Sequence, residues 1–357
     1  MGMVQPPAEP PVDRAAGSRR PVTGWFSSPG RTSVTVRGPD AVRFVDGFTT
    51  AAVASLATGE SREGMVLDPR GHVLAIVRLL RTTDGVIIDG DPGIGIDLAA
   101  HLERYHIRER LEIVDDSAGR SACVAMGTDA IAWLARELMP GDAADEGAGG
   151  AGDALERQFD VAGIWPAARL FQVPSAAFGS VHERLTRAGP PRLEAAAVEA
   201  ARIAHAYPAP HDIPAGTLPQ ELGRDARAIS FTKGCYLGQE TVARIDALGH
   251  VNRLLVLLTC GDHVPAPGAA VEGRHQGGGE EVVGRVTSAC RTADGGGMAL
   301  AIVARRALGE GGRLVIDGRV ARPCANVDSG IDPAGRSCSD RGSSGATGDD
   351  GGRGAMR

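Results

Sequence analysis

The residues with the clearest capacity for chemistry lie in KGCYLGQE, residues 233–240, where a cysteine follows a lysine and a glycine. The stretch QETVARIDAL (239–248) has the apolar spacing of a helix, and Gly249 follows it as a stop signal. Cys235 is therefore predicted in a glycine-flanked turn just before a helix N-terminus, where free backbone N–H groups and the helix dipole favour an anion. Because Lys233 adds a positive charge two residues away, we predict a reactive thiolate at Cys235.

The same residues allow a simpler interpretation, and the pattern alone does not decide between the two. Cys235 could be a small buried hydrophobe, with the glycines serving only a tight turn. Gln239 and Glu240 would complement the helix dipole in a first turn whatever else they do. The six cysteines include no C-x-x-C pair, and the nine histidines show no HxH or HExxH spacing, so no disulfide framework or metal site is expected.

Composition limits the class of protein. A chain of 357 residues is too long for one core and suggests two or three domains. Its formal net charge is −6, and no run of Lys or Arg forms a basic stripe, so nucleic acid is not the expected partner. No segment approaches the roughly 20 apolar residues that span a bilayer, and the Pro-rich start lacks a signal-peptide core. We therefore expect a cytoplasmic protein that does not bind membranes.

The order of predicted elements indicates an α+β fold. The first block reads as a strand at 32–36, a helix to about 48, three strands within 64–90, a helix at about 93–106 and a strand at 110–116. GDPGIG (90–95) reads as a turn into that helix and not as a phosphate loop. The second block predicts strands near 122–126, 157–162 and 169–173, helices at 128–138, 175–188 and 193–206, and a short extended segment at 228–231. Four to six short strands after Val251 predict a small β-barrel.

These blocks give five segments with different expected structure. Residues 1–21 and 328–357 are expected to be disordered, because they contain too little apolar surface to offset their ordering entropy. A first α+β subdomain spans 22–120, a second one spans 121–250 and contains the KGCYLGQE motif, and the barrel spans 251–327. The Gly-rich patch at 141–154 is expected to be a surface loop within the second subdomain.

The motif resembles a known signature. K-G-C-Y-x-G-Q-E is similar to that of the YgfZ-type folate-binding proteins, relatives of the aminomethyltransferase (T-protein) of the glycine cleavage system. LPQELG (218–223), ETVAR (240–244), LDPRGHVL (67–74) and HLERYHIRERLEI (101–113) also fit this family, so the resemblance covers about residues 25–325. It implies two α+β units and a C-terminal barrel around a central tetrahydrofolate site. It also implies a role in assembling or repairing iron-sulfur clusters of other enzymes, including ones that modify tRNA.

The resemblance points to particular residues for each role. Cys235 and Lys233 would form the reactive centre, and Tyr236 belongs to the same signature. A pterin ring presents an amino group and an N–H side by side, which a carboxylate accepts, while the glutamate tail of folate suits arginine. The candidates for the ring are Glu221, Gln239 and Glu240, and those for the tail are Arg202 and Arg244. For each arginine, a solvated surface ion pair is the simpler alternative.

This chain departs from the family at three places that matter, and one of them is the tail beyond about residue 328, which has no counterpart in the family. Ala75 and Ile76 stand where T-proteins carry the aspartates that position folate for methylene transfer, and Ala204 stands where an acid would clasp the pterin. Our leading hypothesis is therefore a tetrahydrofolate-binding protein of iron-sulfur maintenance, with iron-sulfur enzymes or assembly factors as partners. The alternatives are a true folate-dependent aminomethyltransferase or related one-carbon transferase, and a scaffold that has lost folate.

Overall fold

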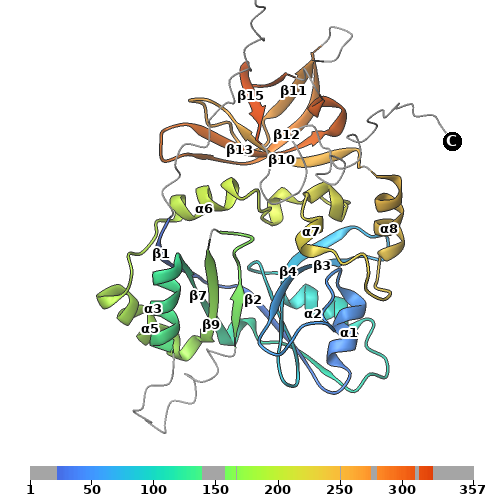
Figure 1. Ribbon diagram of the computed structural model, residues 1–357, viewed down its shortest axis with the longest axis vertical. Coiled ribbons are helices and arrows are strands. Elements are labelled where there is room, and N and C mark those ends of the chain that lie inside the picture. The colour runs from blue at the N-terminus through green and yellow to red at the C-terminus, as the bar shows by residue number, and fades with distance from the viewer. Residues whose placement is uncertain are drawn as a thin grey trace, which may run out of the picture.

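Three parts make up the molecule in the computed structural model (Figure 1). The structure describes residues 22–138, 157–165, 167–249, 251–274, 280–309 and 313–324. Two sheets lie side by side below, a barrel lies above them, and helix α6 (Ala195–Ala204) runs between the barrel and the sheets. The segments predicted to be disordered, 1–21 and 328–357, and the Gly-rich patch 141–154 lie outside the described residues. The predicted α+β fold with a C-terminal barrel is confirmed.

The first sheet has five antiparallel strands in the order β3-β4-β5-β2-β6. The strands and their two helices are β2 (Thr32–Arg37), α1 (Ala41–Phe48), β3 (Ser61–Leu67), β4 (Val73–Arg81), β5 (Gly85–Gly90), α2 (Gly95–Glu103) and β6 (Glu112–Asp115). Val34 and Val77 on one face pack against α1 and against Leu98 of α2. Met65, Ile76 and Ile87 on the other face pack toward the second sheet. Because both faces are covered, β4 is apolar almost throughout instead of alternating.

The second sheet has the order β1-β7-β9-β8, with α3 and α5 packed on it. Its elements are β1 (Gly24–Ser28), β7 (Arg120–Met126), α3 (Thr128–Leu138), β8 (Gln158–Asp160), β9 (Ala168–Pro174) and α5 (Ser175–Ala188). β1 was not predicted as a strand, and its residues fell within the first subdomain. Instead β1 pairs with β7, Trp25 lying opposite Ala125. Its partner is distant in sequence, so local pattern could not indicate this pairing.

A connecting region joins the sheets to the barrel. After α6 come two 3₁₀ helices, η2 (Pro210–Asp212) and η3 (Pro219–Leu222), then α7 (Asp225–Ala228) and α8 (Gln239–Leu248). The extended segment predicted at 228–231 is wrong at its first residue, because Ala228 closes the single turn of α7 and extended backbone begins at Ile229. The predicted helix at 239–248 is confirmed, and Gly249 ends it with φ 76°.

The third part is a closed barrel of six strands. They are β10 (Arg253–Thr259), β11 (Ala270–Arg274), β12 (Glu280–Arg291), β13 (Gly297–Ala304), β14 (Leu314–Ile316) and β15 (Arg319–Pro323). Leu254 and Leu258 fill the barrel, while the alternate residues Leu255 and Leu257 join the central core beside α6. The barrel is thus fixed to the rest of the molecule by one apolar outer face.

Candidate functional site

Residues 233–238, which precede α8, form a loop that Lys233 holds to the end of helix α1. Its Nζ donates to the carbonyl oxygens of Asp46, Thr49 (3.0 Å) and Ala51 (2.7 Å), and lies 3.3 Å from Asp46 Oδ1. Burial lowers the pKa of Lys233, and the Asp46 carboxylate opposes that change. The ammonium therefore caps the C-terminal carbonyls of α1.

Gly238 brings the loop against the turn between β3 and β4. Its φ of 80° favours glycine, and a Cβ there would lie 2.8 Å from the Asp68 carbonyl oxygen. Thr241 Oγ1 donates to the Arg70 carbonyl at 2.8 Å, and the Leu237 N–H donates to the Gly47 carbonyl at 3.0 Å. The loop is thus held between α1 and the β3–β4 turn.

Tyr236 and Gln239 fix the last turn before α8. Tyr236 is buried, and the Lys233 ammonium lies 5.3 Å from the centre of its ring. The Tyr236 N–H donates to Gln239 Oε1 at 3.3 Å, and the Gln239 N–H donates back to the Tyr236 carbonyl at 3.1 Å. Burial raises the pKa of Tyr236 to about 12, so its hydroxyl stays protonated at neutral pH.

Cys235 is the exception among these motif side chains. It is exposed, and its thiol makes no hydrogen bond with a described residue. The interpretation of Cys235 as a buried hydrophobe is therefore wrong. Lys233, Tyr236, Gly238 and Gln239 all hold the loop in place, whereas the thiol contributes to none of these contacts.

Two further predicted residues, Glu240 and Arg244, are exposed on α8 and form no ion pair within the described part of the chain. Two others are already engaged inside the molecule. Glu221 accepts from the Leu218 N–H at 3.0 Å and from Arg253 Nε at 2.8 Å. The buried Glu221 carboxylate therefore already serves two donors of the protein itself.

Arg202 ties α6 to the barrel. Its guanidinium donates to Asp212 Oδ2 (2.8 Å), Ser288 Oγ of β12 (2.8 Å) and Glu199 Oε2 (2.8 Å). Burial opposes the charged form, but these carboxylates outweigh it and raise the pKa of Arg202. The alternative of a surface ion pair is wrong for this buried residue, and a folate tail would have to compete with Asp212.

A buried charge cluster that sequence reasoning missed lies where the first sheet meets the segment after α6. Glu63 of β3 faces Arg78 of β4, with Glu63 Oε2 3.2 Å from Arg78 Nη2 and 2.7 Å from Arg224 Nη2. Burial alone would raise the pKa of Glu63, but the two guanidiniums outweigh it and hold that pKa below its usual value. The Arg78 and Arg224 guanidinium carbons lie 5.3 and 4.8 Å from the ring centre of Tyr207.

Beside this cluster, three polar groups have unused bonding capacity. The Tyr207 hydroxyl makes no hydrogen bond with a described residue, and Arg78 Nη2 lies outside hydrogen-bond geometry despite its ion pair. The Asp91 carboxylate has one long ion pair, 3.8 Å to Arg31 Nη1. Burial, with Asp89 adding to it, raises the pKa of Asp91 against the opposing charges of Arg31, Arg78 and Arg202. These groups could receive a polar ligand.

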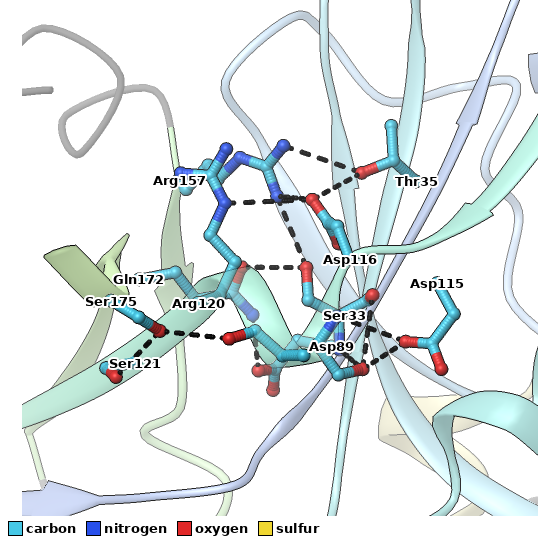
Figure 2. Close-up of polar contacts among 12 residues, drawn as sticks. Ser33, Thr35, Asp89, Asp115, Asp116, Arg120, Ser121, Arg157, Gln172 and Ser175 are labelled. Atoms are coloured by element: carbon cyan, nitrogen blue, oxygen red, sulfur yellow. Dashed lines mark hydrogen bonds and ion pairs between the residues drawn. The ribbon is translucent and has the colours of Figure 1, made fainter. Parts of the chain in front are cut away.

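A polar network continues from Asp89 across the boundary of the two sheets (Figure 2). Gln172 of β9 donates from Nε2 to Asp89 Oδ1 at 2.9 Å and accepts from Ser33 Oγ at 3.1 Å. Arg157 then donates to Ser33 Oγ at 3.2 Å and to Asp116 Oδ2 at 2.9 Å. Side chains from β2, β5 and β9 thus cross-link the two sheets.

Two cavities are described, and Cys235 lines neither. One of about 840 Å³ lies between α6, η2 and the outer face of β12, and the other of about 790 Å³ lies where the two sheets meet. Among the described residues, no group of His, Cys, Asp and Glu is arranged to hold a metal ion. Within the same ranges, no helix has the length and apolarity needed to cross a bilayer.

Replacing Lys233 with methionine should reduce the free energy of unfolding by about 1–3 kcal/mol, because it leaves converging carbonyls and Asp46 without their donor. Urea denaturation followed by circular dichroism would measure this. The matched control is Arg244→Met on exposed α8, which should change stability by less than about 0.5 kcal/mol. Equal stability of the two variants would contradict the capping role of Lys233.

Comparison with solved structures shows which class of protein has this fold. The fold is similar to that of glycine cleavage system aminomethyltransferase T from Bartonella henselae, with a TM-score of 0.67, 18% identity and 86% of each chain covered. The chain therefore has the fold of the aminomethyltransferase T-proteins. No protein-family model matches it.

Sequence relatives narrow the class further. A tRNA-modifying protein YgfZ from Cronobacter sakazakii is 31% identical over 279 residues, covering 74% of this chain and 79% of the relative. Its counterpart from Serratia proteamaculans is 29% identical over 293 residues, covering 80% and 86%. The chain belongs to the YgfZ family.

Proposed function

We propose that this protein binds tetrahydrofolate and uses the Cys235 thiolate in the assembly or repair of iron-sulfur clusters of other enzymes. The observation that carries the proposal is the contrast within the motif. Lys233, Tyr236, Gly238 and Gln239 hold the loop, and Cys235 is exposed with no hydrogen bond from its thiol to a described residue. An exposed thiol on a firmly held loop suits reaction with a partner protein, a cluster or a one-carbon adduct.

The folate site that we propose lies beside Tyr207, at the meeting of the two sheets and α6. A pterin offers adjacent N–H donors, and the Asp91 carboxylate has acceptor capacity there to receive them. The Tyr207 hydroxyl and Arg78 Nη2 add a donor each. Asp91 would then take the role of the acid that Ala204 lacks, and Arg244 remains available for the glutamate tail.

The clients that we propose include enzymes that modify tRNA. The relatives from Cronobacter and Serratia are named tRNA-modifying proteins. A role in iron-sulfur maintenance accounts for such a name without direct contact with RNA, since the formal charge of this chain is −6.

Methylene transfer is the rival function, favoured by the similarity to aminomethyltransferase T. Against it, the positions that the family resemblance assigns to the folate-orienting acids are occupied by Ala75 and Ile76, both buried on β4. No carboxylate at these positions can orient folate for transfer. Transfer of a methylene group from an aminomethyl-lipoyl carrier to tetrahydrofolate should therefore be undetectable.

The folate site has its own test. Asp91→Asn should weaken tetrahydrofolate binding by about tenfold or more in calorimetric titration, because an amide can accept only one of the two pterin donors. Wild-type affinity should also fall as the pH is lowered, and it should begin to fall at a higher pH than an ordinary aspartate would cause. The raised pKa of Asp91 makes its carboxylate take up a proton, and lose acceptor capacity, at a higher pH than an ordinary aspartate.

Asp97→Asn, on the exposed side of α2, is the matched control and should bind like wild type. Wild-type protein that binds no tetrahydrofolate would contradict the cofactor assignment, and unchanged binding by Asp91→Asn would contradict this site.

The iron-sulfur role is tested in a strain that lacks its own YgfZ protein. Expression of this chain should restore the activity of iron-sulfur enzymes in that strain, including one that modifies tRNA. The control is an enzyme without an iron-sulfur cluster, assayed in the same cells. The proposal would be contradicted if the strain lost the activity of enzymes with and without clusters equally, or if this chain did not restore the iron-sulfur enzymes.

A further inference from the structure

The cavity of about 790 Å³ between the sheets is rich in arginine. It lies where β8 and β9 meet the ends of β2, β3 and the β4–β5 turn, away from the barrel. Five arginines line it, together with hydroxyl side chains such as Thr35, Thr58 and Thr83. We name it the arginine cavity; its arginines are Arg37, Arg62, Arg81, Arg157 and Arg169.

Three of these arginines have no carboxylate partner within the described part of the chain. Arg62 Nη1 donates to the Ala52 carbonyl at 3.2 Å, and Arg81 Nη1 donates to the Gly85 carbonyl at 2.9 Å. Arg169 is exposed, and its side chain makes no hydrogen bond with a described residue. Their positive charges are therefore not neutralised by an ion pair.

The other two arginines pair with acids that do not line the cavity. Arg157 Nη1 bonds to Asp116 Oδ2 at 2.9 Å, at the end of the network in Figure 2, and Arg37 Nη2 lies 2.7 Å from Glu112 Oε2. These pairs fix the direction of each guanidinium. Arg157 is also buried, so the network positions one cationic wall of the cavity.

Three carboxylates also line the cavity, and each is engaged in its own turn. Glu60 Oε2 accepts from the Ala57 N–H at 2.9 Å, and Asp160 Oδ1 accepts from the Ala162 N–H at 2.9 Å. Asp84 Oδ1 accepts from Thr82 Oγ1 at 3.0 Å. All three acids are exposed, whereas the arginines reach the cavity from strands on both sides, so an anion can approach the guanidiniums without displacing a carboxylate.

We propose that the arginine cavity binds the phosphate groups of a small phosphorylated molecule. Guanidinium forks match phosphate oxygens, and threonine hydroxyls add donors. No aromatic side chain lines the cavity, so it lacks a surface on which a base or a pterin could stack. Its volume lies in the range of sites for small ligands. This site is separate from the folate site beside Asp91 and Tyr207.

The test is calorimetric titration of the full chain with inorganic pyrophosphate at low ionic strength. Wild type should bind, and the double variant Arg62→Ala/Arg169→Ala should bind at least about tenfold more weakly, because it loses two charge-assisted contacts. Arg319→Ala, on β15 of the barrel, is the matched control and should bind like wild type. Thermal unfolding of each variant and tetrahydrofolate titration should be unchanged, which separates loss of this site from misfolding or failure of the folate site.

Two results would overturn the proposal: no pyrophosphate binding by wild type at millimolar concentration, or equal binding by wild type and the double variant. A parallel titration with a short single-stranded RNA distinguishes the source of the phosphate. If the RNA bound through Arg62 and Arg169 while pyrophosphate did not, the small-molecule assignment would be wrong.

Discussion

Glu63→Ala is expected to lower the free energy of unfolding by about 3–5 kcal/mol. The variant removes the carboxylate that lies between Arg78 and Arg224, and it leaves two guanidiniums buried without their shared counter-charge. Water cannot replace that carboxylate easily, because all three side chains are almost fully buried. Urea denaturation at pH 7, monitored by circular dichroism, would measure the loss.

The matched control for this prediction is Glu112→Ala. Glu112 also pairs with an arginine, Arg37, at 2.7 Å, but both side chains are more than half exposed. Its removal should therefore change stability by less than about 1 kcal/mol. If Glu63→Ala were as mild as Glu112→Ala, the charge cluster would not contribute to stability in the way that its burial implies.

Cys235→Ser is expected to abolish the restoration of iron-sulfur enzymes while leaving the protein as stable as wild type. Serine keeps the size of the side chain but does not form a thiolate, so it cannot attack or ligate as sulfur does. Because the thiol is exposed and makes no hydrogen bond with a described residue, its loss should shift the melting temperature by less than about 2 °C. Enzyme activity in the complemented strain and calorimetry of the purified protein would measure the two effects.

Cys290→Ser, in the barrel strand β12, serves as the matched control and should retain full activity. Complete restoration of iron-sulfur enzymes by Cys235→Ser would contradict the proposed role of the thiol. In that case the loop would act only as a docking element, and folate binding would remain to be judged by titration.

Elements with a strong local signal could be predicted from the sequence. The apolar spacing in QETVARIDAL and the glycine after it predicted α8 and its end, since a left-handed residue at Gly249 is a local requirement. Short strands separated by Gly and Pro turns predicted the barrel, although β11 and its bulged pairing with β12 were missed. β1 was missed because its partner, β7, is about a hundred residues away.

Roles that depend on distant partners could not be predicted. Lys233 stands two residues from Cys235 in sequence, so it was interpreted as a charge for the thiol, but its ammonium contacts the end of α1. Arg202 and Glu221 were interpreted as ligand groups because nothing local indicated Asp212 or Arg253 as partners. A signal for Asp91 was present: VIIDGD places two acids, Asp89 and Asp91, at the end of an otherwise apolar strand.

The pairing of β1 with β7 has a consequence for how the chain is made and divided. During synthesis β1 cannot pair until residues 120–126 have been made, because the whole five-stranded sheet lies between the two partners in sequence. A single cut near residue 120 would therefore separate β1 from its sheet and expose an edge of β7 to intermolecular pairing. A fragment intended to contain the complete second sheet must therefore include β1 as well as β7, β8 and β9.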